Sequence, residues 1–381
     1  MISAVCFLLL IENNVTFVFV YFHYFRMGAY EGLRFHLTAS YLLGIGATAA
    51  SIFVVYSWNK QRKAQAYWNA PFTLAGRVAQ LCLYPVKSCK KIETTYLDCE
   101  IRGPKNGQRV DREFVLVDEL RGNTLISARQ CPRMVLIEVD VKDQRLLVQF
   151  PNGRHVEVDL EEVSRRNDVK KAILHENKRT DGLDCGEEIA SAFSEYLDPE
   201  NKRQLRLLRF SPELFTERDS IVNTKAWANP VPADFQDHIS YADDAAFMIN
   251  TLASVDDLNF RLKADSLNPI SVDNFRPVIV VSEASAYDED RWLEVRIGDA
   301  EFVCYKACSR CILTTVNPEN GTMQPEMQPL KKLREYRLAP EGPLRDFYGR
   351  SPIFGVYLGL KKPGRIQVGD EIHVRYKPSA F

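Results

Sequence analysis

The sequence predicts a mainly β protein with helical insertions (α+β), in which two β-rich domains follow an apolar N-terminal segment. Three observations predict this class. Beyond residue 75 the chain alternates short apolar runs with turn residues, as antiparallel strands do. Apolar residues at helical spacing recur at two places in this part. The chain has 381 residues, enough for two domains, and its first 58 residues carry four formal charges.

The overall composition excludes several classes of protein. With 49 basic and 50 acidic residues the formal charge is -1, so no nucleic-acid partner is expected. The chain is 46% hydrophobic and 26% charged, which is typical of globular proteins rather than disordered ones. Its nine cysteines lack the spacing of a disulfide framework, which favours reduced thiols in a cytosol-facing protein.

Residues 1–36 form an apolar N-terminal extension that does not match a secretory signal. Two apolar runs, Met1–Ile11 and Val15–Phe25, are separated by a short polar break. A secretory signal would begin with basic residues and end at a small-residue cleavage site, and neither is evident. One interpretation is that translation starts at Met27. Whether residues 1–25 cross a membrane stays open.

Residues 37–59 are predicted to form a transmembrane anchor. They carry no charge, and 20 of them would give about 30 Å of helix, the thickness of a hydrocarbon core. A buried core helix is the alternative, but it would need a large surrounding domain. The linker over residues 60–75 begins with a basic cluster, which by the positive-inside rule places the rest of the chain in the cytosol.

The first β-rich domain is expected over residues 76–200. Seven short strands favour an antiparallel sandwich or a barrel-like domain. A helix is expected to start at Asp184, an N-cap with Glu187 three residues later. The expected strands are Arg77–Leu83, Thr94–Leu97, Glu113–Asp118, Leu125–Ala128, Met134–Val141, Arg145–Phe150 and His155–Val158.

The second domain, over residues 205–377, is also expected to be β-rich. It starts with a strand over residues 205–210, followed by a Pro-, Asp- and Asn-rich crossover over residues 211–240. Leucine and valine residues at helical spacing predict a helix between Phe247 and Leu262. Two similar turns flanked by alternating residues favour β-hairpins. These turns are Ile297-Gly298-Asp299 and Val368-Gly369-Asp370.

Three cysteines within eight residues, Cys304, Cys308 and Cys311, have several chemical interpretations. A structural zinc site is disfavoured because no further ligand pair follows. A thioredoxin-like pair would open a helix, whereas the β-branched run Ile312–Val316 favours a strand. The spacing also matches the cluster motif of radical enzymes that use S-adenosylmethionine, but those need βα units after it. Two interpretations remain. The cysteines could be buried small hydrophobes, which we accept for Cys304, or one of them could be a single thiolate ligand to a transition metal.

Basic residues stand where strands begin or end. The segment Tyr84–Lys90 ends a strand in a proline-containing turn and offers the ammonium of Lys87 and the hydroxyl of Ser88. Arg112 and Arg276 each stand at the start of a predicted strand. Each could be an ordinary surface charge, but a phosphate group would use this combination of donors. Together they suggest a site for an anionic cofactor.

The motifs of the chain resemble those of the mitochondrial amidoxime-reducing component family, over about residues 76–377. That family joins an N-terminal β-barrel domain to a β-barrel MOSC domain and has an N-terminal membrane anchor. The resemblance therefore implies a barrel-like domain packed on a MOSC barrel. The shared segments, in order, are YPVKSCK (84–90), DREFVLVD (111–118), ARQCPRMVLI (128–137), DCGE (184–187), NFRPVIVV (274–281), CSRCILTTVNPENG (308–321), YGRSPIFGVYL (348–358) and GRIQVGDEI (364–372).

The resemblance implies a molybdenum–molybdopterin cofactor with Cys311 as the metal ligand and catalytic residue. Cys308 corresponds to a non-ligand. Asp244 and Ala245 depart from the family, which usually has small hydroxyl residues there, so their contribution to pterin binding stays open. The residues implied around the cofactor are Lys87, Ser88, Arg112, Asp243, Arg276, Ser309, Arg310, Cys311 and Tyr357.

The resemblance also implies an activity and a location. The activity is the molybdenum-dependent reduction of N-hydroxylated compounds, such as amidoximes, hydroxylamines and N-hydroxyguanidines, in detoxification. The implied partners are cytochrome b5 and the NADH-cytochrome b5 reductase. The chain is expected in the mitochondrial outer membrane, with a monomeric catalytic domain facing the cytosol.

Two other hypotheses come from different classes. The chain could be a molybdenum-cofactor carrier or sulfur-transfer module without reductase turnover. It could also be a membrane-anchored scaffold that binds no molybdenum.

Overall fold

The computed structural model describes residues 2–11, 14–23, 68–174, 177–200, 202–218, 238–377 and 379–380. The chain divides into two compact units, Met1–Gln65 and Ala66–Phe381. The described part of the first unit is an antiparallel pair of strands, β1 (Ile2–Ile11) and β2 (Asn14–His23). The predicted anchor, the alternative start at Met27 and the linker up to residue 67 lie outside the described residues. Within the described ranges, no helix has the length and apolar character needed to span a membrane.

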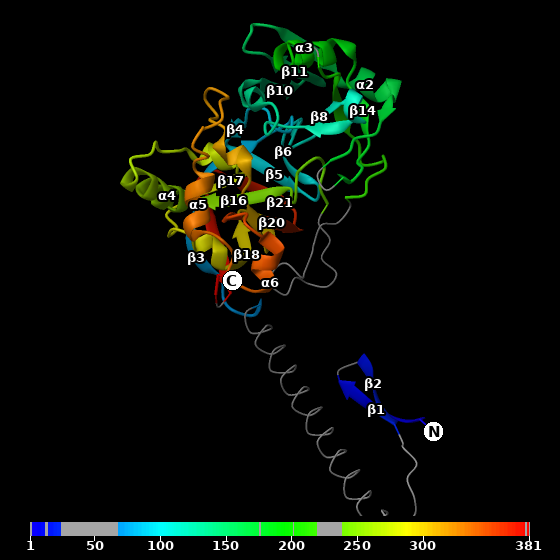
Figure 1. Cartoon of the computed structure of the whole chain (residues 1–381), viewed down its shortest axis with the longest axis vertical. Helices are drawn as coiled ribbons and strands as arrows, with labels where there is room; N and C mark the ends of the chain where they lie inside the picture. The colour runs from blue at the N-terminus through cyan, green and yellow to red at the C-terminus, as the bar shows by residue number, and fades with distance from the viewer. Residues whose placement is uncertain are drawn as a thin grey trace, which may run out of the picture. The chain divides into compact units, whose positions relative to one another are not determined.

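A closed seven-stranded barrel forms one part of the second unit (Figure 1). Pairing of β3 with β17 closes the ring. The short strand β4 (Ile92–Thr94) pairs with β3 but lies outside the ring. Only the pair β16–β17 is parallel within this barrel. Around the ring the strands are β17 (Ile279–Ser282), β16 (Phe247–Thr251), β20 (Ile353–Lys362), β19 (Ala300–Ser309), β18 (Trp292–Ile297), β22 (Glu371–Tyr376) and β3 (Thr73–Leu83).

Inward-facing apolar side chains fill the barrel. Phe247 and Phe302 meet edge-to-face with ring centroids 5.2 Å apart, and Trp292 is fully buried. Aromatic side chains of this size contribute a large share of the apolar area that a core buries. The alternation of apolar and polar residues that predicted strands from the sequence therefore corresponds to the inner and outer faces of the barrel.

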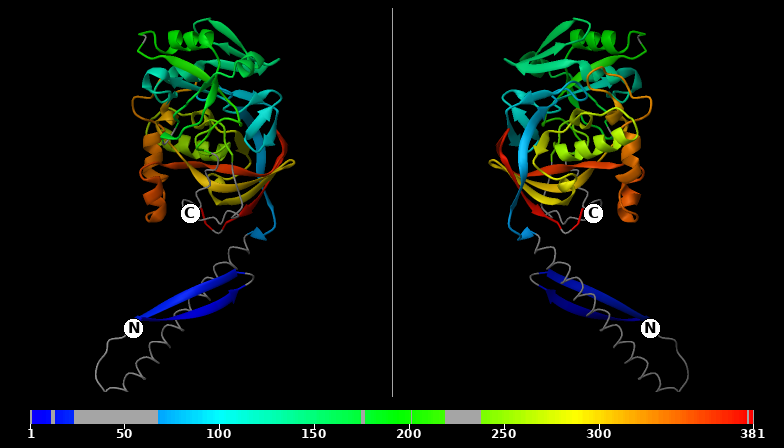
Figure 2. Two further views of the ribbon diagram at one scale, coloured as in Figure 1. Left: turned by 90° about the vertical axis from the view of Figure 1, so that its right-hand side faces the viewer. Right: turned by 90° about the vertical axis from the view of Figure 1, so that its left-hand side faces the viewer.

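The other part of this unit contains two further sheets and two helices, seen beyond the barrel in Figure 2. Its own core includes an edge-to-face contact between Phe150 and Phe193, with centroids 5.1 Å apart. One sheet has the order β13 (Val169–Lys170), β14 (Gly182–Asp184), β15 (Leu205–Phe210), β8 (Phe114–Asp118) and β9 (Thr124–Ile126). The other comprises β10 (Glu138–Lys142), β11 (Arg145–Gln149) and β12 (His155–Asp159), and the helices are α2 (Leu160–Arg166) and α3 (Glu187–Leu197).

A fourth sheet connects distant parts of the chain. Its edge strand β21 comes from the end of the sequence and pairs with β5 from the beginning. Its order is β21 (Gly364–Gln367), β5 (Tyr96–Glu100), β6 (Gly103–Asn106) and β7 (Arg109–Val110). Further helices among the described residues are α4 (Leu252–Ala264), α5 (Leu330–Tyr336), α6 (Pro343–Tyr348) and the 3-10 helices η1 (Glu119–Arg121), η2 (Pro132–Leu136), η5 (Val272–Phe275), η6 (Asp288–Arg291) and η7 (Ile312–Thr315).

The structure confirms a mainly β fold with few helices, and it corrects several local predictions. Residues 247–251 are strand β16, and the helix starts only at Leu252, where the Thr251 hydroxyl caps the backbone N–H of Ser254. The β-branched run after Cys311 forms the 3-10 helix η7 rather than a strand. Residues 132–136, which include part of a predicted strand, also form a 3-10 helix, with Pro132 in its first turn.

Of the two predicted hairpins, one is confirmed. Strands β18 and β19 pair across the Gly298-Asp299 turn, with Ile297 opposite Ala300. The strands that flank Gly369 do not pair with each other, because β21 pairs with β5 whereas β22 pairs with β18 and β3. The helix predicted from Asp184 exists as α3, but its N-cap is Gly186, and Asp184 ends strand β14 instead.

Candidate functional site

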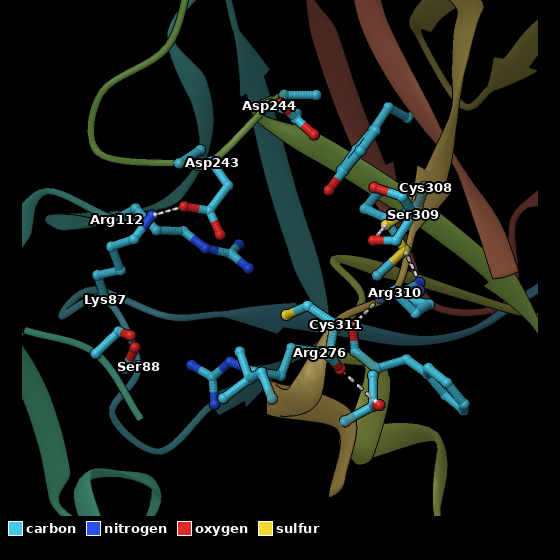
Figure 3. Close-up of a pocket in the computed structure, with 18 of the residues that line it drawn as sticks. Lys87, Ser88, Arg112, Asp243, Asp244, Arg276, Cys308, Ser309, Arg310 and Cys311 are labelled. Carbon is cyan, nitrogen blue, oxygen red and sulfur yellow. Dashed lines mark hydrogen bonds and ion pairs between the residues drawn. The ribbon is translucent and has the colours of Figure 1, made fainter. Parts of the chain in front are cut away.

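A cavity of about 160 Å³ brings together all nine residues that the sequence singled out. They reach it from segments far apart in the chain (Figure 3). Lys87 and Ser88 come from the turn after β3, Arg112 from the start of β8, and Asp243 from the segment before β16. The others follow η5, end β19, lie between β19 and η7, cap η7 or lie on β20. These are Arg276, Ser309, Arg310, Cys311 and Tyr357.

The turn that carries Lys87 and Ser88 is fastened to the neighbouring strand. The backbone N–H of Lys87 donates to the carbonyl of Phe114 at 2.8 Å, and the N–H of Phe114 donates to the carbonyl of Pro85 at 2.9 Å. Ser88 has a φ of 73°. Left-handed backbone of this kind is uncommon for residues other than glycine, and such conformations recur at ligand-binding sites.

Arg112 and Arg276 share this backbone conformation, with φ values of 47° and 53°. Both guanidinium groups stack on the ring of Tyr84, at 4.4 Å and 4.2 Å from its centroid. Arg112 is also bonded to Asp111 at 2.5 Å, and Arg276 donates to the carbonyl of Cys89 at 2.7 Å. Burial lowers the pKa of Arg276, and the nearby Arg112 lowers it further. A negatively charged ligand would relieve the repulsion between these two cations.

Lys87 is a buried lysine with one carboxylate partner. Its ammonium donates to Asp243 at 2.6 Å and to the carbonyl of Tyr241 at 2.5 Å. Burial lowers the pKa of Lys87 to about 8, although Asp243 acts in the opposite direction. The segment that carries Asp243 is held by Arg218, which donates to the Asp243 carbonyl at 2.6 Å.

Cys311 directs its sulfur at a guanidinium that sequence reasoning did not identify. The Nε of Arg129 lies 3.3 Å from the Cys311 Sγ, and the Nη2 of Arg129 lies 3.0 Å from the Asp243 carboxylate. Arg129 belongs to the ARQCPRMVLI segment quoted above, but no pattern in the sequence connects it with Cys311. It reaches the cavity from the loop between β9 and η2.

Arg310 lines the cavity, but its guanidinium is directed into the protein. It donates to the carbonyls of Phe354 at 2.7 Å and Phe275 at 2.9 Å, and to the Asn250 side chain at 3.0 Å. Its side chain is therefore satisfied by barrel groups. Arg310 is next to Cys311 in the sequence but has no hydrogen bond to its sulfur, which instead accepts from Arg129.

The remaining wall of the cavity contains Tyr357, Cys308 and Asp244. Burial raises the pKa of Cys308 and of Tyr357, so both groups stay protonated near neutral pH. Asp244 pairs with Lys306 at 3.0 Å. Cys304 is fully buried on β19, as the sequence predicts for a small hydrophobe.

The donor set fits an anionic cofactor with a soft metal. Five basic and two acidic side chains line the cavity, and Cys311 is its partly exposed thiol. No cluster of three or more His, Cys, Asp or Glu residues forms a metal site in the part of the chain that the structure describes. A metal at Cys311 would therefore take most of its ligands from a cofactor, and a soft thiolate suits a transition metal.

Comparison with known proteins gives a consistent result. Residues 75–200 match the model of the MOSC N-terminal beta barrel domain, and residues 236–373 match that of the MOSC domain. The chain is 36% identical over 302 residues to human mitochondrial amidoxime-reducing component 1, covering 78% of this chain and 83% of that protein. It is 34% identical over 303 residues to human mitochondrial amidoxime reducing component 2, covering 78% of this chain and 83% of that protein. For component 1 of Xenopus laevis the identity is 32% over 348 residues, covering 91% and 94%.

Proposed function

Because the chain belongs to the amidoxime-reducing component family of MOSC-domain proteins, we propose that it is a molybdenum-cofactor-dependent oxidoreductase that reduces N-hydroxylated compounds. The observation that carries the proposal is the position of Cys311. Its sulfur lies in a cavity lined by five basic side chains from both matched regions. A thiolate and several cations in one cavity suit a metal-bearing, phosphorylated cofactor.

Each of the nine predicted site residues has a role in this proposal. Cys311 binds the metal. The phosphate and pterin of molybdopterin are bound by Lys87, Ser88, Arg112 and Arg276. The bound cofactor supplies the two-electron chemistry that exchanges an N–OH group for N–H and releases water. The protein groups hold it in place and exclude water from its buried side. The supporting residues are Asp243, Ser309, Arg310 and Tyr357.

The substrates and electron donors follow from the family. We propose amidoximes, hydroxylamines and N-hydroxyguanidines as substrates. Each turnover consumes two electrons and two protons, and the sequence has no nicotinamide or flavin fingerprint that would let this chain collect them from NADH directly. Cytochrome b5, reduced by its NADH-dependent reductase, is the proposed donor.

The proposed location is the mitochondrial outer membrane, with the catalytic part facing the cytosol. The names of the relatives place them in mitochondria. The uncharged stretch over residues 37–59 and the basic residues after it are the sequence features that support an anchor in this orientation.

Replacing Cys311 tests the function directly. Cys311→Ala is expected to lower bound molybdenum and benzamidoxime reduction by more than roughly 100-fold, because even a group that only supports a metal ligand is worth up to about 100-fold. Molybdenum is measured by elemental analysis of the loaded enzyme, and turnover with the cytochrome b5 chain. Cys304→Ala is the matched control, since Cys304 is a buried thiol seven residues away that does not line the cavity.

The same measurements separate the proposal from its rivals. A Cys311→Ala enzyme that kept both molybdenum and activity would contradict the assignment of the ligand. A wild-type protein that binds molybdenum but never reduces benzamidoxime would be a cofactor carrier. A wild-type protein without molybdenum would agree with a scaffold.

A further inference from the structure

We propose that Arg129 is a positioning residue for Cys311, whose guanidinium fixes the cysteine sulfur and the Asp243 carboxylate in one arrangement that faces the cavity. The inference rests on the proposed function, because its importance depends on Cys311 being the metal ligand. It assigns a role to a side chain that the sequence did not connect with the site.

The geometry links four side chains in a row. Arg129 donates from Nε to the Cys311 Sγ at 3.3 Å and from its second donor to one oxygen of Asp243 at 3.0 Å. The other oxygen of Asp243 accepts from Lys87 at 2.6 Å. The planar guanidinium presents its donors in a fixed fork, so bonds to two acceptors at once define where both lie.

Arg129 is itself held in place by a tight turn. The backbone N–H groups of Gln130 and Cys131 both donate to the carbonyl of Ser127 at 3.0 Å. The N–H of Arg129 donates to the Ser127 hydroxyl at 3.3 Å, and that hydroxyl donates to the Gln130 side chain at 2.7 Å. Three quarters of the Arg129 side chain is buried, since its exposed fraction is 25%. Its guanidinium therefore starts from an ordered backbone and has little freedom.

No other basic side chain of the cavity has a hydrogen bond to the Cys311 sulfur among the described residues. The donors of Arg310, next in sequence, are used by Phe354, Phe275 and Asn250. Lys87 is used by Asp243 and the Tyr241 carbonyl. The Cys311 sulfur is therefore positioned by Arg129, which lies in the MOSC N-terminal region, although Cys311 itself lies in the MOSC region.

Hydrogen bonds to a ligating sulfur affect both the affinity of a metal site and its electronic properties. Arg129→Ala in the loaded enzyme should therefore release molybdenum roughly 10- to 100-fold faster during dialysis. It should also shift the electron paramagnetic resonance spectrum of the partly reduced enzyme. Arg129→Lys keeps the charge but not the fork, so we expect an intermediate loss rate, and this variant also serves if the alanine variant fails to fold.

Two further variants sharpen the experiment. If Arg129 and Asp243 act as one unit, adding Asp243→Asn to Arg129→Ala should accelerate metal loss by less than the product of the two single effects. Arg109→Ala is the matched control, because it removes a comparable bidentate pair with Asp140, at 2.5 Å and 3.0 Å, outside the cavity. We expect wild-type retention and spectrum for that control.

Crystal structures of the cofactor-free protein provide a readout that does not depend on loading. In the wild type we expect one Cys311 rotamer that faces the cavity, and in Arg129→Ala several. The same single rotamer in both, or a loaded Arg129→Ala enzyme with unchanged retention and spectrum, would overturn the proposal. A wild type that takes up no molybdenum would instead refute the proposed function, and the Cys311 rotamers would still decide the role of Arg129.

Discussion

Asp244 places a second carboxylate on the wall of a cavity whose charged side chains are mostly basic. Lys306 lies 3.0 Å from this carboxylate, and the hydroxyl of Tyr305 donates to the Asp244 carbonyl at 3.1 Å. Both charged side chains are largely buried, with exposed fractions of 28% for Asp244 and 14% for Lys306. Lys306 therefore offsets a negative charge that would otherwise repel an anionic cofactor.

Removing this lysine should weaken cofactor binding. We expect Lys306→Met to lower the molybdenum content at limiting cofactor by roughly 10-fold, since an unpaired, partly buried carboxylate costs at least about 1 kcal/mol. Elemental analysis checks the content. The double variant Lys306→Met with Asp244→Asn should recover most of it, because no charge is then left unpaired. Equal losses in the single and double variants would show that Lys306 acts through something other than the charge of Asp244.

The site residues show which contacts a sequence can predict. Lys87, Arg112 and Arg276 could be predicted because each stands where a strand begins or ends, and such positions meet at a sheet edge. Arg129 could not, because its contact with Cys311 depends on how two distant segments of the chain pack. Arg310 shows that adjacency in the sequence does not ensure contact, since its guanidinium bonds to barrel groups and not to the neighbouring Cys311 sulfur.

At the scale of elements, Gly355 lets β20 pass close to β16. Its φ is 81°, and a Cβ there would lie 2.5 Å from the Asn250 side-chain nitrogen and 2.8 Å from the carbonyl of Ile249. Phe354, the preceding residue, supplies the carbonyl that accepts from Arg310. The strand therefore needs glycine at this position for the barrel wall and the cavity to coexist.

Gly355→Ala should destabilise the protein by about 2–4 kcal/mol, because it combines an unfavourable φ with a backbone clash. Urea unfolding of the second unit, Ala66–Phe381, measures the change. Gly369→Ala is the matched control, since Gly369 has a φ of 91° with nothing within 4 Å of a Cβ. It should cost only the backbone strain, roughly 1 kcal/mol. If both variants lose the same stability, the close approach to β16 is not what requires glycine.

The elements also show the limits of periodicity. Alternation identified most strands, because it reports which face of a strand is buried. It does not report the partner, so it predicted a hairpin at Gly369 where β21 and β22 pair with other strands. Strand β16 was predicted as helix because it is buried on both faces and has no alternation, and only Thr251 marks where the helix begins.

Over the whole molecule, buried thiols connect stability with pH. Burial raises the pKa of Cys82 and Cys89 to about 12, and it raises those of Cys99, Cys185 and Cys304 as well. The unfolded chain loses these protons near pH 9, whereas the folded chain keeps them. Between pH 9 and 12 the folded state therefore binds more protons, and stability falls as the pH rises.

The free energy of unfolding should thus decline above pH 9, by up to about 1.4 kcal/mol per pH unit for each such thiol. Lys87 and Lys377, whose pKa values are lowered to about 8 by burial, act in the opposite direction and are outnumbered. Urea unfolding under reducing conditions from pH 7 to 11 measures the profile. Cys82→Ala should make the decline shallower, and a flat wild-type profile would contradict the prediction.

The resemblance implied a barrel, but no pattern in the residues predicted the pair that closes it, because that pair joins β3, the first of its strands, to β17, roughly 200 residues later. That pairing also determines when the barrel can close while the protein is being synthesised. Strand β3 leaves the ribosome early, but its partners β17 and β22 follow much later. Lys87, Arg112 and Arg129 are thus made long before Cys311 exists to face them. The cavity is complete only after Cys311 and Tyr357 have been made, so the cofactor must enter a chain whose MOSC region has already been synthesised.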